Sequence, residues 1–209
     1  MQTIDHGQFV NMLRSAAGLI RSNEPLLSKL DSFGGDGDHG TTMVRAMNNL
    51  EQAIVSCASQ EIQTLLSDIG WAVMGTDGGA TGPLFGTFFM GMSEAVNGQA
   101  VDAAGLAKAF ESGLASIQQQ SKAKVGDKTM LDALIPAVEA GKKAASGGGD
   151  VLAVVKQAAE AAEAGAAATT NMQARFGRAK NIGPKSIGNP DAGATSVSFL
   201  FKGFLTGLM

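Results

Sequence analysis

Apolar residues recur at spacings of three and four along most of the chain, which places them on one face of an α-helix. Six windows show the pattern most clearly, and they contain Phe9, Leu13, Ala16 and Ile20; Met43, Met47, Leu50 and Ile54; Leu106, Phe110, Leu114 and Ile117; Leu131, Leu134, Ile135 and Val138; Val151, Val155 and Ala162; and Val197, Phe201, Phe204 and Leu208. Further helical segments are expected near residues 61–75 and 82–97. The pattern therefore predicts about eight amphipathic helices.

Aspartates stand where three of these helices are expected to begin. Asp102, Asp127 and Asp150 precede helical windows, and a carboxylate there can cap the free amides of the first helical turn. Apolar and polar residues do not alternate over any sustained stretch, and tyrosine is absent, so a sheet-based fold is disfavoured. We expect an all-α protein.

Size and charge narrow the class of protein. A chain of 209 residues is most economically a single domain spanning residues 1–209. The formal net charge of -3 gives no general attraction to nucleic acid or to an anionic membrane. The single cysteine, Cys57, suits a reducing compartment and is expected to be inert. With no signal-peptide pattern at residues 1–9 and no long apolar run, we expect a soluble, cytoplasmic protein.

The connection from Leu30 to Thr42 holds the densest chemistry. Asp31, Asp36 and Asp38 lie within eight positions, and the neighbouring glycines let the backbone turn sharply enough for the three carboxylates to face one point. Their repulsion would then call for a hard divalent cation with oxygen ligands, and magnesium completed by substrate phosphates fits best. The alternative is that the aspartates serve only as helix caps and turn formers.

Two familiar motifs match this connection only superficially. Gly35, Gly37 and Gly40 satisfy the dinucleotide pattern G-x-G-x-x-G, but no strand precedes them and the aspartates between them would repel a bare pyrophosphate. A calcium-binding EF-hand loop that started at Asp36 would need a glutamate where Met47 stands. Both assignments are excluded.

Two other connections have features of phosphate-binding loops. Gly78 to Pro83 consists mostly of small residues and leads into a helix, whose free amides favour an anion, although close helix packing explains the small residues equally well. From residue 164 to residue 190 there is no acidic residue but a group of cations that includes Arg175 and Arg178. Such a segment can neutralise phosphate oxygens or receive an acidic partner, or it can be a solvated loop. His39 could contact a nucleotide or be an ordinary surface histidine.

Five motifs, in this order along the chain, together resemble the L-domain family of dihydroxyacetone kinases. They are Gly35-Asp36-Gly37-Asp38-His39-Gly40, the segment from Gly78 to Thr87, Gly126-Asp127-Lys128-Thr129-Met130, Met172-Gln173-Ala174-Arg175, and the segment from Asp191 to Ser196. The match covers nearly the whole chain. The resemblance implies a closed antiparallel barrel of eight helices with the nucleotide at one end.

The resemblance also implies site residues. It assigns Asp31, Asp36 and Asp38 as the ligands of two magnesium ions that face the diphosphate. It assigns the nucleotide contacts to His39, Gly40, Thr41, Thr42, Ala80, Thr81, Ser121, Met130, Arg178, Asp191, Ala192 and Gly193. Ser121, Ala192 and Thr42 depart from residues common in the family, where glycine, proline and asparagine respectively are found.

The family's activity implies partners. A separate K subunit holds dihydroxyacetone, so no catalytic residue beyond those that position metal and phosphate is expected in this chain. In one branch ADP stays bound and is rephosphorylated by a phosphohistidine carrier, the M subunit, from phosphoenolpyruvate. In the other branch ATP binds and ADP leaves, and the substrate is dihydroxyacetone or a ketotetrose such as erythrulose. The length of the chain favours the first branch, and a nucleotide-sensing module for a transcription regulator is a further alternative.

Overall fold

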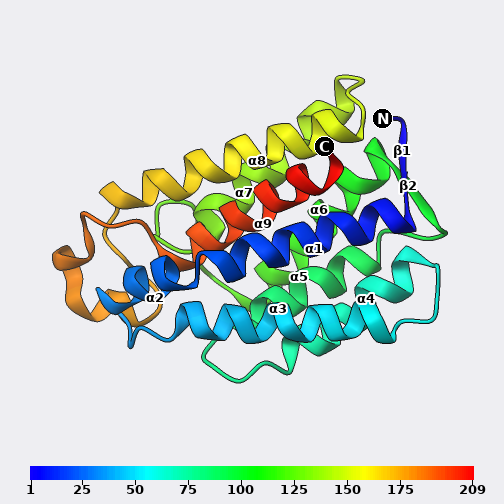
Figure 1. The fold of residues 1–209 in the computed structure, drawn as a ribbon. Coiled ribbons are helices and arrows are strands. Elements are labelled where there is room, and N and C mark those ends of the chain that lie inside the picture. The colour runs from blue at the N-terminus through cyan, green and yellow to red at the C-terminus, as the bar shows by residue number, and fades with distance from the viewer.

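The computed structural model describes residues 1–209 and is built almost entirely of helices, so the predicted all-α class is confirmed (Figure 1). The α-helices are α1 His6–Ser22, α2 Glu24–Ser32, α3 His39–Ser56, α4 Ile62–Met74, α5 Thr81–Ser93, α6 Ala103–Gln120, α7 Leu131–Ser146, α8 Val151–Ala168 and α9 Ala192–Leu208. Two 3-10 segments, η1 Thr169–Asn171 and η2 Arg178–Ser186, precede α9. None of the helices has the length and apolar character needed to cross a membrane.

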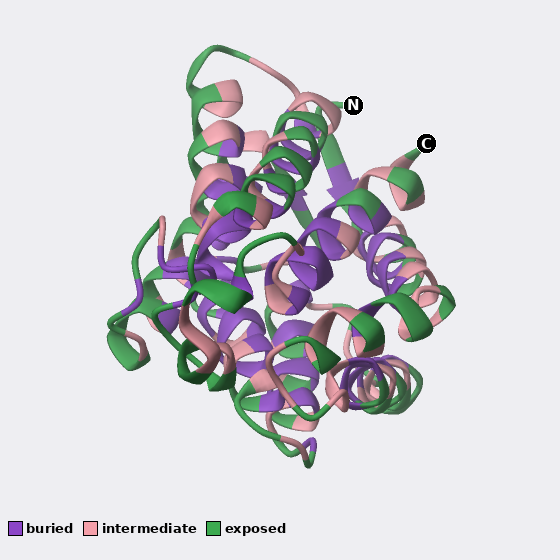
Figure 2. Ribbon diagram, turned by 90° about the vertical axis from the view of Figure 1, so that its left-hand side faces the viewer, coloured by how far each residue is buried: buried purple, intermediate pink, exposed green.

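The long helices pack side by side in the order of the chain. From α3 to α9 each helix contacts the next one, and α1 contacts both α3 and α9. The short helix α2 contacts α3 and α9, and in Figure 1 it lies with the orange segment that contains η2 at the left-hand end of the molecule. Both chain termini lie at the opposite end. Seen from the α2 end, the buried faces of the long helices are turned toward one another (Figure 2).

Aromatic residues of three helices form the centre of the core. Phe201 of α9 lies 5.1 Å from Phe110 of α6 and 6.4 Å from Phe88 of α5, measured between ring centroids. All three side chains are buried. Burying each phenylalanine contributes about 1.5–3 kcal/mol, and well-oriented ring pairs add about 0.5–1.5 kcal/mol. The core therefore joins the last helix firmly to helices from the middle of the chain.

Two of the three predicted N-caps are confirmed. The side chain of Asp102 accepts a hydrogen bond from the amide of Gly105 at the start of α6, and that of Asp150 accepts one from the amide of Ala153 at the start of α8. Asp102 also ends β2 (Ala100–Asp102), which pairs in antiparallel fashion with β1 (Thr3–Asp5). This short two-stranded sheet was not predicted, because three residues are too few to show an alternating pattern.

The prediction that Asp127 caps the next helix is wrong. Helix α7 begins at Leu131, and Asp127 instead accepts a hydrogen bond of 2.8 Å from the amide of Lys124. Asp132, inside the first turn of α7, accepts hydrogen bonds from the amides of Gly126 and Thr129. Asp127 and Asp132 thus stabilise the connection before α7 by accepting hydrogen bonds from its backbone amides, and Asp127 does not cap the helix.

Helix boundaries differ from the sequence expectation at two other places. The stretch before the metal loop forms α2, so Asp31 lies in the last turn of a helix and not in a loop. Helix α5 begins at Thr81, which makes Pro83 its third residue, and it ends at Ser93, short of the expected residue 97. The positions of the first residues of α3, α5 and α9 matter most, because these helices begin around one cavity.

Candidate functional site

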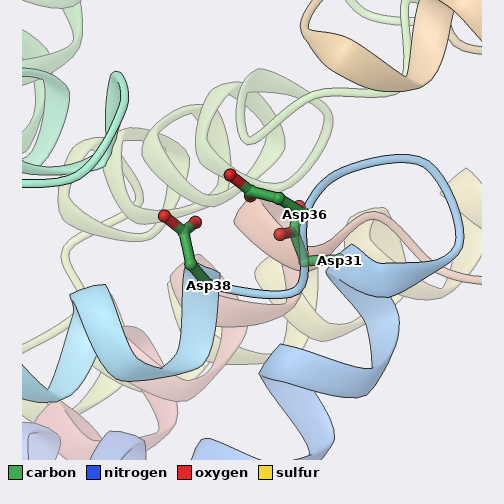
Figure 3. A group of neighbouring side chains, drawn as sticks. All are labelled: Asp31, Asp36 and Asp38. Atoms are coloured by element: carbon green, nitrogen blue, oxygen red, sulfur yellow. The ribbon is translucent and has the colours of Figure 1, made fainter.

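Three carboxylates gather where α2 ends and α3 begins. Asp31 lies in the last turn of α2, Asp38 immediately precedes α3, and Asp36 lies between them. One oxygen atom from each lies within 4.8 Å of the others, and Figure 3 shows the carboxylates turned toward a common region. Asp31 also accepts a hydrogen bond of 2.8 Å from the amide of Gly37, whose φ of 78° favours glycine. The structure thus brings the three predicted residues together.

Within this cluster, the pKa of Asp38 is raised above the ordinary value of an aspartate and that of Asp36 is lowered below it. Burial, a hydrogen bond to Asp36 and the negative charges of Asp36 and Asp31 raise the pKa of Asp38. Burial also acts to raise the pKa of Asp36, but a backbone hydrogen bond and the ion pair with Arg178 outweigh it, so that pKa is lowered. Three carboxylates near a single guanidinium leave an excess of negative charge. A hard cation such as magnesium, which prefers oxygen ligands, fits this donor set.

A cavity of about 440 Å³ opens beside the carboxylates. Eleven of the fifteen predicted site residues line it, and these are Asp31, Asp38, His39, Ala80, Thr81, Ser121, Met130, Arg178, Asp191, Ala192 and Gly193. They come from six separate parts of the chain. The structure therefore assembles most of the predicted residues around one space large enough for a nucleotide-sized ligand.

The other four predicted residues lie outside the cavity lining. Asp36 lies at its edge through its ion pair with the lining residue Arg178. Gly40 lies so close to the backbone of α2 that a side chain would collide with it. Thr41 is exposed and donates a hydrogen bond to the Asp38 carbonyl, whereas Thr42 is buried against Gly78. The first turn of α3 supports the loops around the cavity through these contacts.

His39 connects three of the helices that begin at the cavity. Its Nδ1 atom lies 3.2 Å from the Thr81 hydroxyl of α5, and its Nε2 atom lies 2.8 Å from the Ser196 hydroxyl of α9. Burial lowers the pKa of His39, which favours the neutral imidazole. An ordinary surface histidine would not be bonded in this way, and His39 serves to hold the starts of α3, α5 and α9 in register.

Two helix N-termini face the cavity. Helix α5 begins after Gly78 and Gly79, which have φ angles of 124° and 56° that other residues rarely adopt. Helix α9 begins after Asp191, whose carboxylate accepts a hydrogen bond of 2.7 Å from the amide of Ala194. Burial raises the pKa of Asp191 to about 6. Free amides at helix starts favour anions, so both termini are suited to phosphate oxygens.

The apolar wall of the cavity and its one buried lysine could not be recognised from the sequence. The apolar wall is made mainly by Leu84, Phe85, Ile117, Leu131, Phe176 and Ile182. Most of these residues continue the helical periodicity, so the sequence offers no signal that separates cavity-lining residues from core residues. Lys128 also lines the cavity, although nothing in its sequence surroundings marks it as buried. A cavity whose lining combines apolar and charged side chains is suited to a planar base joined to phosphates.

Comparisons with known proteins agree with this geometry. The chain is 34% identical over 201 residues to the ADP-binding subunit DhaL of the PEP-dependent dihydroxyacetone kinase of Escherichia coli, covering 96% of each chain. It is 34% identical to the corresponding subunit of kinase 1 of Listeria innocua over 97% of each chain. It is also 34% identical to human triokinase/FMN cyclase, of which it covers 34%.

Among solved structures, the chain is similar to the dihydroxyacetone kinase of C. freundii, with a TM-score of 0.72 and 25% identity over 93% of this chain. It spans 33% of that kinase chain. The same kinase in complex with AMP-PNP and Mg²⁺ aligns with a TM-score of 0.71. The family model described as the DAK2 domain matches residues 34–206. The chain therefore belongs to the DAK2 domain family.

Proposed function

We propose that this chain is the nucleotide- and magnesium-binding L subunit of a dihydroxyacetone kinase. The observation that carries the proposal is the meeting of three carboxylates, one arginine and two helix N-termini at a single cavity. Relatives with 34% identity over nearly their full length are ADP-binding subunits of such kinases. The solved complex of the C. freundii kinase holds a nucleotide analogue and Mg²⁺, which supports the same ligands here.

Within this proposal, Asp31, Asp36 and Asp38 would hold two magnesium ions. When bound, the ions neutralise charge on the phosphate oxygens. Arg178 and the amides at the starts of α5 and α9 add fixed positive potential, and the apolar wall receives the adenine base. Of the remaining predicted contacts, His39, Thr81, Ser121 and Met130 line the cavity and shape the bound nucleotide's surroundings.

The chain contributes positioning and electrostatics, and a partner contributes the substrate. We propose that a separate K subunit holds dihydroxyacetone, so this chain would orient the γ-phosphoryl group of bound ATP toward a substrate hydroxyl outside the chain, and ADP would remain after transfer. A phosphohistidine carrier, the M subunit, would then transfer a phosphoryl group that originates from phosphoenolpyruvate to the bound ADP. PEP-dependent relatives that align over 96–97% of their own length support this route.

We further propose that residues 1–209 form one domain in which eight long helices close into an antiparallel barrel. The succession of contacts from α3 to α9 and back through α1 to α3 supports a closed ring. In that arrangement α2 is an additional helix outside the ring of eight, and it covers part of the nucleotide end. Its last turn then supplies Asp31 to the site.

The proposed function can be tested by assaying what the purified protein carries. The protein is prepared without added nucleotide and denatured, and the released small molecules and magnesium are quantified by chromatography and elemental analysis. Roughly one ADP per chain is expected if ADP is a tightly held coenzyme of the PEP-driven route. An empty protein that binds and exchanges ATP would favour an ATP-dependent kinase, and one that binds neither nucleotide with magnesium would refute the proposal.

A further inference from the structure

Lys128, in the connection between α6 and α7, combines two unfavourable features. It is the only residue other than glycine with a positive φ, 60°, and its side chain is buried, with 6% of the residue's surface exposed. Left-handed backbone costs a side-chain-bearing residue free energy, and so does an ammonium group withdrawn from water. Such a combination persists only where the surrounding structure compensates for it.

Two backbone carbonyls supply that compensation. The Lys128 Nζ atom donates hydrogen bonds of 2.6 Å to the carbonyl oxygens of Thr169 and Asn189. Thr169 follows the last residue of α8, so the ammonium also lies at the negative end of that helix. One side chain therefore joins three segments that are distant in the sequence: the connection before α7, the end of α8 and the segment that leads into α9.

The segment held by Lys128 is the one that presents the N-terminus of α9 to the cavity. Asn189, Asp191 and Gly193 all line the cavity. The amide of Asp191 donates a hydrogen bond of 2.8 Å to the Thr169 hydroxyl. Thr169 therefore holds this segment directly through its hydroxyl, and also indirectly through the carbonyl that binds Lys128. Burial lowers the pKa of Lys128, while the negative charges of Asp191 and Asp132 oppose that shift and favour the ammonium form.

We propose that Lys128 is a positioning residue of the nucleotide site, an inference that rests on the proposed function. Its ammonium group holds residues 189–193 against the end of α8, so that the first amides of α9 face the cavity before a ligand arrives. Without this group the segment would have to be ordered at the moment of binding, and the cost would appear as lost affinity. The strained backbone at Lys128 directs the side chain inward to these carbonyls.

The test compares Lys128→Met, which keeps the length of the side chain but removes its charge, with Lys124→Met, a matched change at an exposed lysine of the same connection. Amide hydrogen exchange is measured on the nucleotide-free proteins, and ADP affinity is measured by calorimetry with magnesium. In Lys128→Met we expect faster exchange confined to residues 169–194, unchanged protection of α1 and α6, and roughly tenfold or greater loss of affinity. Lys124→Met is expected to match the unchanged protein.

Unchanged exchange in residues 169–194 together with unchanged ADP affinity would overturn the proposal for Lys128. If Lys128→Met does not fold, Lys128→Gly carries the same test, because glycine adopts a φ of 60° without strain. The exchange measurement needs no nucleotide. Failure of the unchanged protein to bind ADP would therefore refute the proposed function. The exchange data would still decide whether Lys128 orders residues 169–194.

Discussion

Asp36 and Asp38 are two positions apart, yet their pKa values move in opposite directions. Asp36 has Arg178 as its partner, whereas Asp38 faces the charges of the other two carboxylates. A cluster of this kind binds a cation more readily than it binds protons only if all three carboxylates can ionise together. At the scale of single residues, the site therefore carries an excess of negative charge that a bound cation would offset.

Replacing Asp36 by asparagine tests this arrangement. We expect Asp36→Asn to weaken magnesium-dependent ADP binding by at least on the order of tenfold, because the substitution removes a proposed metal ligand and a negative charge. The free energy of unfolding without ligand should change little, since Asp36 and Arg178 are both about half exposed. Calorimetric titration of ADP with magnesium and with EDTA measures the effect.

Asp68→Asn, at an exposed aspartate of α4, is the control for loss of a carboxylate. It should leave ADP binding unchanged. If Asp36→Asn bound ADP with the same magnesium dependence as the unchanged protein, Asp36 would not be a metal ligand.

Asp191 should make stability depend on pH. Its pKa is raised from 3.8 to about 6 in the folded protein, so the folded state binds more protons than the unfolded state between these values. The contribution of Asp191 to stability is complete below about pH 3.8 and is lost as the pH rises through about 6. The loss is at most roughly 3 kcal/mol. Urea unfolding at pH 4, 5, 6 and 7 measures it.

Asp191→Asn keeps a residue that caps helices well and removes the titration. The difference in unfolding free energy between the unchanged protein and this variant should shift in favour of the variant as the pH rises from 4 to 7. A difference that stayed constant over this range would show that Asp191 titrates with the same pKa in both states.

At the scale of elements, the close approach of α1 and α9 depends on a glycine, which has no side chain to keep the two backbones apart. A Cβ atom at Gly203 of α9 would collide with the backbone of Ala16 in α1. We expect Gly203→Ala to lower the free energy of unfolding by about 1–3 kcal/mol, because backbone atoms cannot yield as a flexible side chain does. Chemical denaturation followed by circular dichroism measures the change.

Gly18 of α1 provides a matched control for this prediction. It lies inside a helix, and an added Cβ atom would meet nothing within 4 Å. Gly18→Ala should therefore raise the free energy of unfolding by about 0.5–1 kcal/mol through helix propensity alone. Equal effects of the two substitutions would mean that α1 and α9 are not in close contact in solution.

Elements with strong periodicity could be predicted from the sequence, and elements set by tertiary contacts could not. Helix α2 was missed because Leu27 is its only buried residue, which leaves no apolar stripe to detect. Asp127 looks like a cap, since the residues after it are helical in pattern. Which of Asp127 and Asp132 accepts which amides depends on how the whole connection folds.

At the scale of the whole molecule, some features of the candidate site could likewise be predicted from the sequence, whereas others depend on tertiary contacts. Small and acidic residues at Asp36, Asp38 and Gly78 indicated loops that bind phosphate and metal, and the structure brings these loops to one end. The buried position of Lys128 could not be predicted, because its two carbonyl partners come together only when the end of α8 and the segment before α9 are in place.

Ligand binding should stabilise the whole protein if the site is complete in this chain. With ADP at about one hundred times its dissociation constant and excess magnesium, we expect the free energy of unfolding to rise by about 2.7 kcal/mol. Thermal unfolding with and without EDTA measures this, and chelation should remove most of the gain. A stabilisation by ADP that persisted in EDTA would contradict a metal-bridged site.

The packing of the first helix against the last also bears on how the protein is made. During synthesis α1 is made before the helices α3 to α8, and its partner α9 is made after them. Until then the face of α1 that packs against α9, which includes Ala16, is uncovered, and the cavity lacks the wall that Asp191 and Gly193 supply. The proposed nucleotide site is therefore complete only once α9 has been made and packed, and a nascent chain stalled before α9 would expose an apolar surface that chaperones bind.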